Sequence, residues 1–434
     1  MPDAEALIDA PNPSLQTILE RRFAGDWAAV ESLCLTSLAH DPANAEVAWQ
    51  LAGAQWRRHA PAAAENTMRG AHALNPGNAN IVAAMAQFVA EQGRYGEAQR
   101  LYERALKLDP GATTPAVDLA EIELRNGDWR RGWARYEARL GRADRAHNSI
   151  VSIMARVAPH WAGQSLEGRT LLVYSEQGNG DDLQMARLLP ALAARVQHEG
   201  GRMVLACRQA LHALFSRHFA PCVEIETQAY AQHGTPDYCL PIMSVPLMLR
   251  LKPDDVRGTP YLAADASRVE AWRALVHART PRRDALQIGL VWRGDSKHRR
   301  DAQRSMDLET LDALFSVPNV VFHPLTPGGT ALPASVAHCD LTHHYQLGFD
   351  DVAAHVSTLD AIVTIDSAPL HLGGALGMPV YAMLDHVSQW AWGSAEKQRW
   401  YDSVTLFRQP RPGDWQPVVA RVAQALHALA SARA

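Results

Sequence analysis

Three prolines stand 34 residues apart, at positions 42, 76 and 110. Each closes a similar tail: Ala39-His40-Asp41-Pro42, Ala73-Leu74-Asn75-Pro76 and Lys107-Leu108-Asp109-Pro110. A fixed period of 34 residues is typical of a helix–turn–helix unit that recurs along the chain. One such unit cannot bury its apolar face alone, so we expect neighbouring units to stack into a helical array.

With each proline at position 32 of its unit, the units begin near residues 11, 45 and 79, and a fourth begins near 113. This is the spacing of tetratricopeptide repeats. Small residues, which let paired helices approach closely, fall where the helices of a repeat touch. They are Ala52, Ala64, Ala71, Ala86, Ala98 and Ala105. The turns carry Gly25, Gly93 and Gly127, which suit a helix C-terminus, whereas the second unit has His59 there.

Composition sets outer bounds on the class of protein. The chain has 434 residues, 47% of them hydrophobic and 20% charged, with a net charge of −4, which predicts a soluble protein of two or three domains. The sequence shows no basic run, which argues against nucleic-acid binding, and no apolar stretch long enough for a membrane span. Met1 to Ser14 does not resemble a signal peptide. Five scattered cysteines without a Cys-x-x-Cys pair then favour a reduced, cytoplasmic location. His338, Cys339, His343 and His344 lack partners at ligand spacing, so we expect no metal.

The helical pattern stops near Ala158, and short apolar runs then alternate with helical stretches. Such runs predict buried parallel strands with helices between them. They lie at residues 171–174, 203–205, 288–292, 320–322, 361–365 and 380–383. A charged segment that contains proline, at residues 279–283, divides this region into two halves. We therefore predict an α + α/β chain with a repeat domain at 1–157 and two doubly wound Rossmann-like domains at 158–280 and 281–434, which face each other across a cleft.

The first candidate site follows the first strand of this region, at Ser175-Glu176-Gln177-Gly178-Asn179-Gly180-Asp181-Asp182-Leu183-Gln184. A strand, a glycine-rich turn and a helix start form a ligand site at the carboxyl end of a sheet. Two aspartates at that helix start would repel a diphosphate, and an exposed carboxylate suits a general base. The alternative is that Asp181 only caps the helix.

The second candidate lies between the strands at 361–365 and 380–383, and it contains Asp366, Ser367, Ala368, Pro369, His371, Gly373 and Gly374. Pro369 suits the first turn of a helix, whose free amides and dipole attract phosphate oxygens. Glycine inside a helix costs about 1 kcal/mol relative to alanine, so the two glycines indicate a close approach. The alternative is a tight helix–sheet contact without a ligand.

A third segment, from Arg293 to Ser305, follows the buried strand at 288–292 and carries Arg293, Lys297 and Arg304. Cations at this edge could neutralise the phosphates of a nucleotide and its leaving group. The charge run is equally compatible with a solvated loop.

The repeats followed by Gly-Asn-Gly-Asp-Asp-Leu-Gln and by Asp-Ser-Ala-Pro-Leu-His-Leu-Gly-Gly-Ala-Leu-Gly-Met-Pro-Val resemble tetratricopeptide-repeat glycosyltransferases. Their C-terminal part is similar to the ADP-heptose:lipopolysaccharide heptosyltransferases. The resemblance covers nearly the whole chain, including the ending from Leu406 to Trp415. It implies a GT-B fold, with the acceptor on the first α/β domain and the nucleotide-sugar on the second.

The resemblance also implies roles for individual residues. Asp181 matches the aspartate that activates the acceptor, beside an acceptor-side loop of Gln177, Gly178, Gly180 and Gln184. Asp366 matches the acidic residue near the donor sugar, and Ser367, Ala368 and His371 match the diphosphate loop. The resemblance implies no metal and no cofactor besides the nucleotide-sugar co-substrate. Two departures are Asp182, a second acid beside Asp181, and Arg293, where similar chains have smaller residues.

These observations lead to a functional hypothesis: inverting sugar transfer to the hydroxyl of a protein, flagellin-like by the resemblance, which the concave face of the array recruits. One alternative is a scaffold whose α/β half is inactive. Another is a heptosyltransferase-like enzyme that acts on a glycolipid.

Overall fold

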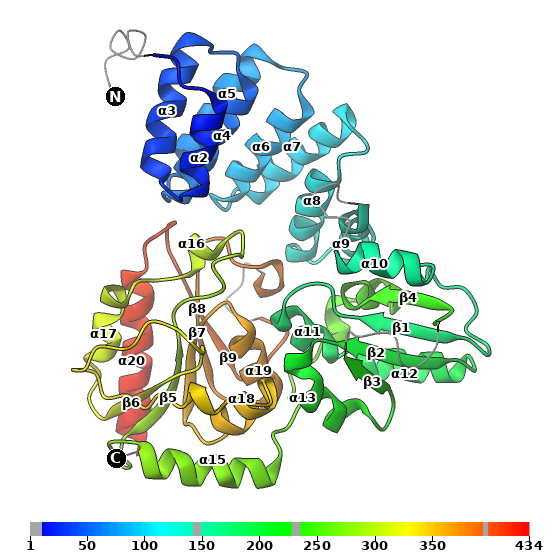
Figure 1. Cartoon of the computed structure of the whole chain (residues 1–434), viewed down its shortest axis with the longest axis vertical. Coiled ribbons are helices and arrows are strands. Elements are labelled where there is room, and N and C mark those ends of the chain that lie inside the picture. The colour runs from blue at the N-terminus through cyan, green and yellow to red at the C-terminus, as the bar shows by residue number, and fades with distance from the viewer. Residues whose placement is uncertain (1–10, 142–148, 228–234, 394–397, 434) are drawn as a thin grey trace.

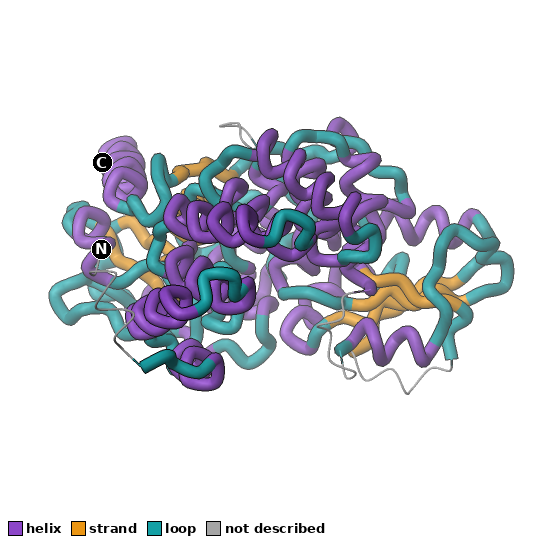
Figure 2. The backbone as a smooth tube through the Cα atoms, turned by 90° about the horizontal axis from the view of Figure 1, so that it is seen from above, coloured by secondary structure: helices purple, strands orange, loops and turns teal. Residues whose placement is uncertain are grey.

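The computed structural model describes residues 11–141, 149–227, 235–393 and 398–433. Figure 1 shows three parts: a helical array at the N-terminus and two α/β domains below it. From above, the strands form two groups on opposite sides of the molecule, with helices between them (Figure 2).

The array consists of four helix pairs in the described part of the chain. They are α2 (Leu15–Phe23) with α3 (Trp27–His40), α4 (Ala45–Arg57) with α5 (Pro61–Leu74), α6 (Ala79–Ala90) with α7 (Tyr95–Leu108), and α8 (Thr113–Arg125) with α9 (Trp129–Tyr136). The first helices of the last three pairs start at residues 45, 79 and 113, where the period places them. The N-terminal tetratricopeptide-repeat array is thus confirmed.

The turn within each pair requires a left-handed backbone. Gly25, Gly93 and Gly127 have φ of +73°, +73° and +86°, and His59 takes φ of +60° at the same place in the second repeat. A non-glycine residue pays a steric cost in this region, so the second repeat keeps the shape of the turn without its preferred residue.

The first α/β domain contains a four-stranded parallel sheet in the order β3-β2-β1-β4. Its strands are β1 (Thr170–Tyr174), β2 (Arg202–Cys207), β3 (Glu224–Thr227) and β4 (Tyr238–Pro241). The helices between and after them are α11 (Asn179–Ala186), α12 (Leu189–His198), α13 (Gln209–Phe219) and α14 (Val245–Met248), with short 3-10 turns at η2 (Ile242–Ser244) and η3 (Pro253–Asp255).

The second α/β domain contains a five-stranded parallel sheet in the order β6-β5-β7-β8-β9. Its strands are β5 (Leu286–Val291), β6 (Val320–Pro324), β7 (Ala361–Ile365), β8 (Val380–Leu384) and β9 (Val404–Arg408). Its helices are α16 (Asp301–Arg304), α17 (Asp312–Phe315), α18 (Phe349–Val356), α19 (Ala368–Leu376) and α20 (Gln416–Arg433), with 3-10 turns at η4 (Leu308–Leu311), η5 (Thr342–His344) and η6 (Trp390–Trp392). The strands β5 to β8 are buried over most of their length, as expected for a sheet covered on both faces, whereas the edge strand β9 is only partly buried.

Two helices pack across the boundaries expected at 157 and 280. Val151 and Met154 of α10 (Ile150–Val157), which follows η1 (Glu137–Gly141), join the core over β1 and β2. Trp272 of α15 (Ala266–Arg279) joins a core with residues of the second sheet and α18. By packing, α10 therefore belongs with the first sheet and α15 with the second.

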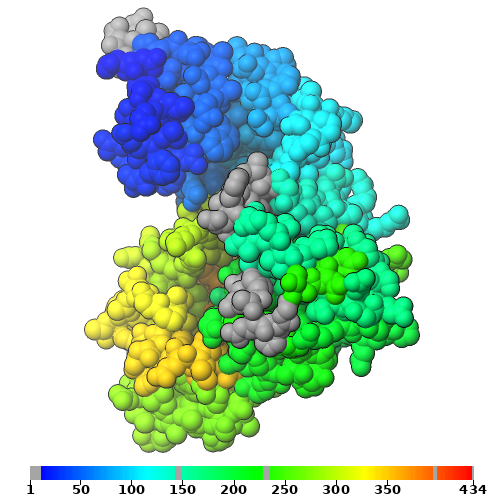
Figure 3. All heavy atoms as spheres, turned by 45° about the vertical axis from the view of Figure 1, so that its right-hand side comes forward, coloured from blue at the N-terminus to red at the C-terminus, as the bar shows by residue number. Residues whose placement is uncertain are grey.

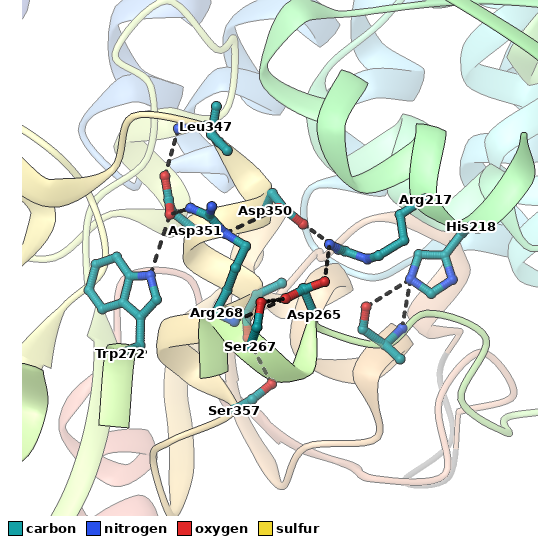
Figure 4. A network of polar contacts seen from close by, with 12 residues as sticks. Arg217, His218, Asp265, Ser267, Arg268, Trp272, Leu347, Asp350, Asp351 and Ser357 are labelled. Atoms are coloured by element: carbon teal, nitrogen blue, oxygen red, sulfur yellow. Dashed lines mark hydrogen bonds and ion pairs between the residues drawn. The ribbon is translucent and has the colours of Figure 1, made fainter. Parts of the chain in front are cut away.

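A polar network ties the two α/β domains together at the end remote from the array (Figure 4). Arg217 of α13 pairs with Asp350 of α18, and Arg268 of α15 pairs with Asp350 and Asp351. Because Asp350 and Asp351 are almost fully buried, these arginines are their compensating charges.

The array also packs on the second α/β domain. The guanidinium of Arg300, before α16, bridges Glu91 of the third repeat and Asp385 after β8. Gln303 donates from Nε2 to the Trp56 carbonyl at 3.4 Å. The surface is indented between the first repeats, in blue, and the second α/β domain, in yellow (Figure 3). These contacts join the second and third repeats to the second α/β domain.

Candidate functional site

The first part of the site is the turn between β1 and α11. Gly178 is the N-cap of α11, and its amide donates to Asp181 Oδ2 at 2.9 Å. Asp181 therefore caps its own helix, as the alternative interpretation expected. Asp181 is partly buried, and burial raises the pKa of its carboxyl, which would strengthen its basicity once it is ionised.

The neighbouring Asp182 lies in a different environment. Its side chain is 0% exposed and lies 3.4 Å from the guanidinium of Arg208. Burial raises the pKa of Asp182 to about 7. Because Asp182 is enclosed, Asp181 is the carboxylate of this pair that can reach a substrate.

The sequence placed Gly180 and Gln184 in an acceptor-side loop, and the structure corrects this placement. Both residues lie within helix α11, and Gln184 is fully buried. Gln177 and Gly178 precede the helix, and Gln177 donates from Nε2 to the Tyr136 hydroxyl of the array at 3.0 Å.

The second part of the site is the end of β7 and the start of α19. The Asp366 carboxylate accepts a 2.9 Å hydrogen bond from Trp392 Nε1, and its backbone carbonyl accepts one from Arg304 at 2.8 Å. Burial, as the largest cause, raises the pKa of Asp366 to about 6. An aspartate and an arginine thus lie beside the same helix N-terminus.

Ser367 is the N-cap of α19, and its side chain makes no capping hydrogen bond. Its hydroxyl lies 3.1 Å from Thr364 Oγ1 instead. His371 is buried one turn further on, 3.0 Å from the Tyr401 hydroxyl and stacked on Trp392. Burial lowers the pKa of His371 to about 3, so the ring is neutral near pH 7.

The two parts meet at Gly180. A Cβ atom built on this glycine would lie 3.1 Å from the His371 ring and 3.4 Å from Ala368 Cα. The N-termini of α11 and α19 are therefore in contact, and Asp181 lies one residue from that contact. The structure thus brings Gly180, the residue before Asp181, against Ala368 and His371 at the start of α19.

The predicted cations separate into one that joins this cluster and two that do not. Arg304 donates a hydrogen bond to the backbone carbonyl of Asp366. The Arg304 guanidinium lies so close to Gly294 that a Cβ atom built on this glycine would be 2.5 Å from it. Arg293 is exposed and pairs with Asp307 and the Met306 carbonyl. Lys297 lies exposed in the loop before α16.

Gly373, a candidate phosphate-binding residue, packs closely against the second sheet. A Cβ there would lie 2.7 Å from Val380 and 2.8 Å from Ile362, and one at Gly374 would lie 2.4 Å from the Tyr401 ring. The close approach that requires these glycines is made by the sheet and by Tyr401. The tight-packing alternative therefore accounts for both residues without a ligand.

The array supplies side chains that the sequence did not indicate. Arg139 of η1 is 1% exposed and donates to Glu176, which directly precedes Gln177, at 2.7 Å. It also pairs with Glu137 at 2.5 Å and bonds Ser244 at 2.7 Å. Removing one partner from such a buried pair leaves an uncompensated charge, so Arg139 fixes the turn before α11.

Trp392 and Tyr401 are the other residues that the sequence reading missed. The signal was the density of aromatic residues in Trp390-Ala391-Trp392 and Trp400-Tyr401. These two segments show neither strand nor helix periodicity, so the sequence does not indicate what the rings contact.

Two further findings concern metals and membranes. Among the residues that the structure describes, no three His, Cys, Asp or Glu side chains gather as metal ligands would. In the same residues, no helix combines the length and apolarity needed to cross a bilayer.

The fold and site define a class: a tetratricopeptide-repeat protein whose C-terminal part carries two parallel-sheet domains. Residues 89–138 match the tetratricopeptide repeat family. The chain is 28% identical over 337 residues to Protein FlbA of Caulobacter vibrioides (strain ATCC 19089 / CIP 103742 / CB 15). That match covers 72% of this chain and 54% of the relative, so the chain spans about half the relative's length.

Solved structures are similar to the array region. The first TPR of Spaghetti (RPAP3) bound to an HSP90 peptide is 22% identical, covers 28% of this chain and 90% of that chain, and has a TM-score of 0.24. MamA protein is 16% identical, covers 32% of this chain and 72% of that chain, and has a TM-score of 0.27. Likenesses at this level carry no argument about function.

Proposed function

We propose that this protein transfers a sugar from a nucleoside-diphosphate sugar to a hydroxyl of an acceptor, with inversion and without a metal. The observation that carries the proposal is the contact of the α11 and α19 N-termini at Gly180. Asp181 follows Gly180 directly in the chain, and the start of α19 on the other side of the contact offers backbone amides and a helix dipole that favour phosphate.

The diphosphate would lie at Ser367 and Ala368, with the guanidinium of Arg304 beside it. Charge-assisted hydrogen bonds from arginine are the strong ones in such sites. As the bond from the anomeric carbon to the diphosphate oxygen breaks, the nucleoside diphosphate leaves with the electron pair. These donors stabilise the charge that develops on it.

Asp181 would act as general base. The acceptor oxygen attacks the anomeric carbon from the face opposite the leaving group, and its proton passes to the Asp181 carboxylate. Because the pKa of Asp181 is raised, the acid limb of the rate profile would lie above the ordinary range for aspartate.

The acceptor in this proposal is a protein that the array recruits. Helical solenoids bind partners along an extended concave face. The array is joined to the second domain through Arg300, so a bound polypeptide would be held at a fixed distance from the site.

Calorimetry with UDP, GDP, CDP and ADP tests the donor side. We expect one nucleotide to bind, and Arg304→Met to weaken it by about 10- to 100-fold, since a charged hydrogen bond contributes about 1.5–3 kcal/mol. Arg293→Met is the matched control, because Arg293 is exposed and pairs with Asp307. If the wild-type chain bound none of the four nucleotides, the proposal would be wrong.

A second candidate function is a scaffold, favoured by one observation. Asp181 caps its own helix, and Gly180 contacts α19 directly. These contacts would serve equally to close two inactive domains on each other. A scaffold would bind a partner through the array and show no affinity for any nucleotide-sugar.

A further inference from the structure

One side of the turn η6, which lies between β8 and β9, contacts residues of the candidate site. Trp392 donates from Nε1 to Asp366 Oδ2 at 2.9 Å. The same indole stacks on His371, with ring centroids 5.3 Å apart. Trp392 is therefore a neighbour of two residues at the start of α19.

The other side of η6 lies on the array. The Trp390 ring packs edge-on against Trp129 and Trp133 of α9, with centroids 6.3 and 5.1 Å apart. Trp129 also stacks on Trp400, with centroids 5.8 Å apart. One short turn thus joins the aromatic core of the fourth repeat to the Asp366 carboxylate.

Two arginines, one from the array and one from the second sheet, donate hydrogen bonds to this turn and the residues beside it. Arg125 of α8 donates to the carbonyl of Gly393 at 2.9 Å and to that of Ser388. Arg408 of β9 donates to Ser388 Oγ at 2.6 Å and to the Trp392 carbonyl at 2.7 Å. Arg408 belongs to the sheet itself, whereas Arg125 belongs to the array.

We propose that Arg125 is a positioning residue: by fixing the backbone of the Trp390–Trp392 turn, it sets the hydrogen bond from Trp392 to Asp366. The fourth repeat is then part of the donor side of the site as well as of the array. The meaning of Asp366 for sugar transfer rests on the proposed function, but the linkage of Arg125 to Asp366 does not.

A merely structural role for Arg125 would change stability and leave the titration of Asp366 unaltered. The hydrogen bond from Trp392 opposes the rise in the Asp366 pKa that burial causes. The other charged groups that act on Asp366 are Asp385 and Arg304, and Arg408 and Tyr401 are coupled to it. His371 is neutral there. The backbone of Gln389, in the same turn, also donates to Asp366, so a shift in titration reports the placement of this turn. Because Arg125 also carries a charge that acts on Arg408, Trp390→Leu, which changes no charge, separates the loss of that charge from a displaced turn.

The experiment follows the Trp392 indole N–H by NMR of the full chain with ¹⁵N-labelled tryptophan, assigned with Trp392→Phe, from pH 4.5 to 8.5. In the wild type we expect this resonance to move with a midpoint near the Asp366 pKa of about 6. In Arg125→Met, we expect either loss of that pH dependence or a midpoint at least half a pH unit higher. Arg125→Lys, which can still donate to a carbonyl, should restore part of the wild-type behaviour.

The matched control is Arg131→Met on α9, whose side chain is 54% exposed and pairs with Glu123 and Asp128. It should titrate as the wild type does. If Arg125→Met is poorly folded, Trp390→Leu tests the same turn from its aromatic side and should produce the same shift. If Arg125→Met and Trp390→Leu both titrated with the wild-type midpoint and the wild-type chemical shift of Trp392, the proposal would be wrong. Absence of nucleotide binding by the wild type would sink the transferase proposal alone.

Discussion

Asp182 shows how two adjacent residues of one type acquire different properties. Asp181 is partly buried at the start of α11, whereas Asp182 is fully buried beside Arg208. The sequence gives the pair Asp-Asp but not which member faces inward, because the loop length before the helix determines that. The sequence left open which of the two aspartates is the base, and in the structure Asp182 is enclosed.

This burial predicts a pH-dependent cost of stability. The pKa of Asp182 rises from an ordinary 3.8 to about 7 in the folded chain. The folded state therefore binds a proton more tightly than the unfolded state, and stability is lost as pH rises from about 4 to about 7. Asp182→Asn removes the ionisation, so its gain in stability over the wild type should be larger at pH 8 than at pH 5, by about 2–3 kcal/mol. Urea unfolding at both pH values measures this, and a gain no larger at pH 8 than at pH 5 would contradict it.

At the scale of elements, the repeat period placed the starts of three first helices correctly, and each of the six apolar runs became a strand. The strands β3, β4 and β9 were missed. β3 reads Glu-Ile-Glu-Thr and β4 ends in proline, so neither shows the continuous apolar run of a buried parallel strand. β9 is half-buried at the sheet edge and carries Arg408.

Two helical glycines give opposite predictions within the array. A Cβ on Gly132 of α9 would lie 2.7 Å from the Leu124 side chain and 3.0 Å from its backbone nitrogen, so Gly132→Ala should destabilise the chain by about 1–3 kcal/mol. A Cβ on Gly53 of α4 would meet nothing within 4 Å, so Gly53→Ala should stabilise it by about 1 kcal/mol. Thermal unfolding of both variants tests the packing. Equal effects would mean that α8 and α9 are not in this close contact.

At the scale of the whole molecule, the contacts between array and α/β region could not be predicted from the sequence. Arg125 and Gly393 are separated by 268 positions, and no local pattern links them. Periodicity reports which face of an element is apolar, not which distant element covers it. The candidate residues at 181 and 366 could be proposed, but the array residues that contact the neighbouring segments, Arg125 and Arg139, could not.

These contacts predict that the last repeat cannot be separated from the α/β region. A chain that begins at residue 158 would expose Trp390 and Trp400, which pack on Trp129, and the face of the first sheet that α10 covers. Exposed apolar surface of this kind promotes aggregation. A chain that begins at residue 11 keeps these contacts and the packing of every repeat, and it should be soluble and monodisperse in size-exclusion chromatography. If the shorter chain were equally well behaved, the array would be an independent appendage.

The central claim is that Asp181 of one domain and the α19 start of the other form one reacting site. Its most direct test is the turnover of Asp181→Asn with the donor identified in the nucleotide screen, measured as nucleotide released with acceptor present. We expect turnover to fall by about 10²- to 10⁴-fold, the usual contribution of a general base, with nucleotide affinity unchanged. Asp254→Asn, at a side chain 95% exposed, is the control and should retain full turnover. Full turnover in Asp181→Asn would contradict the claim.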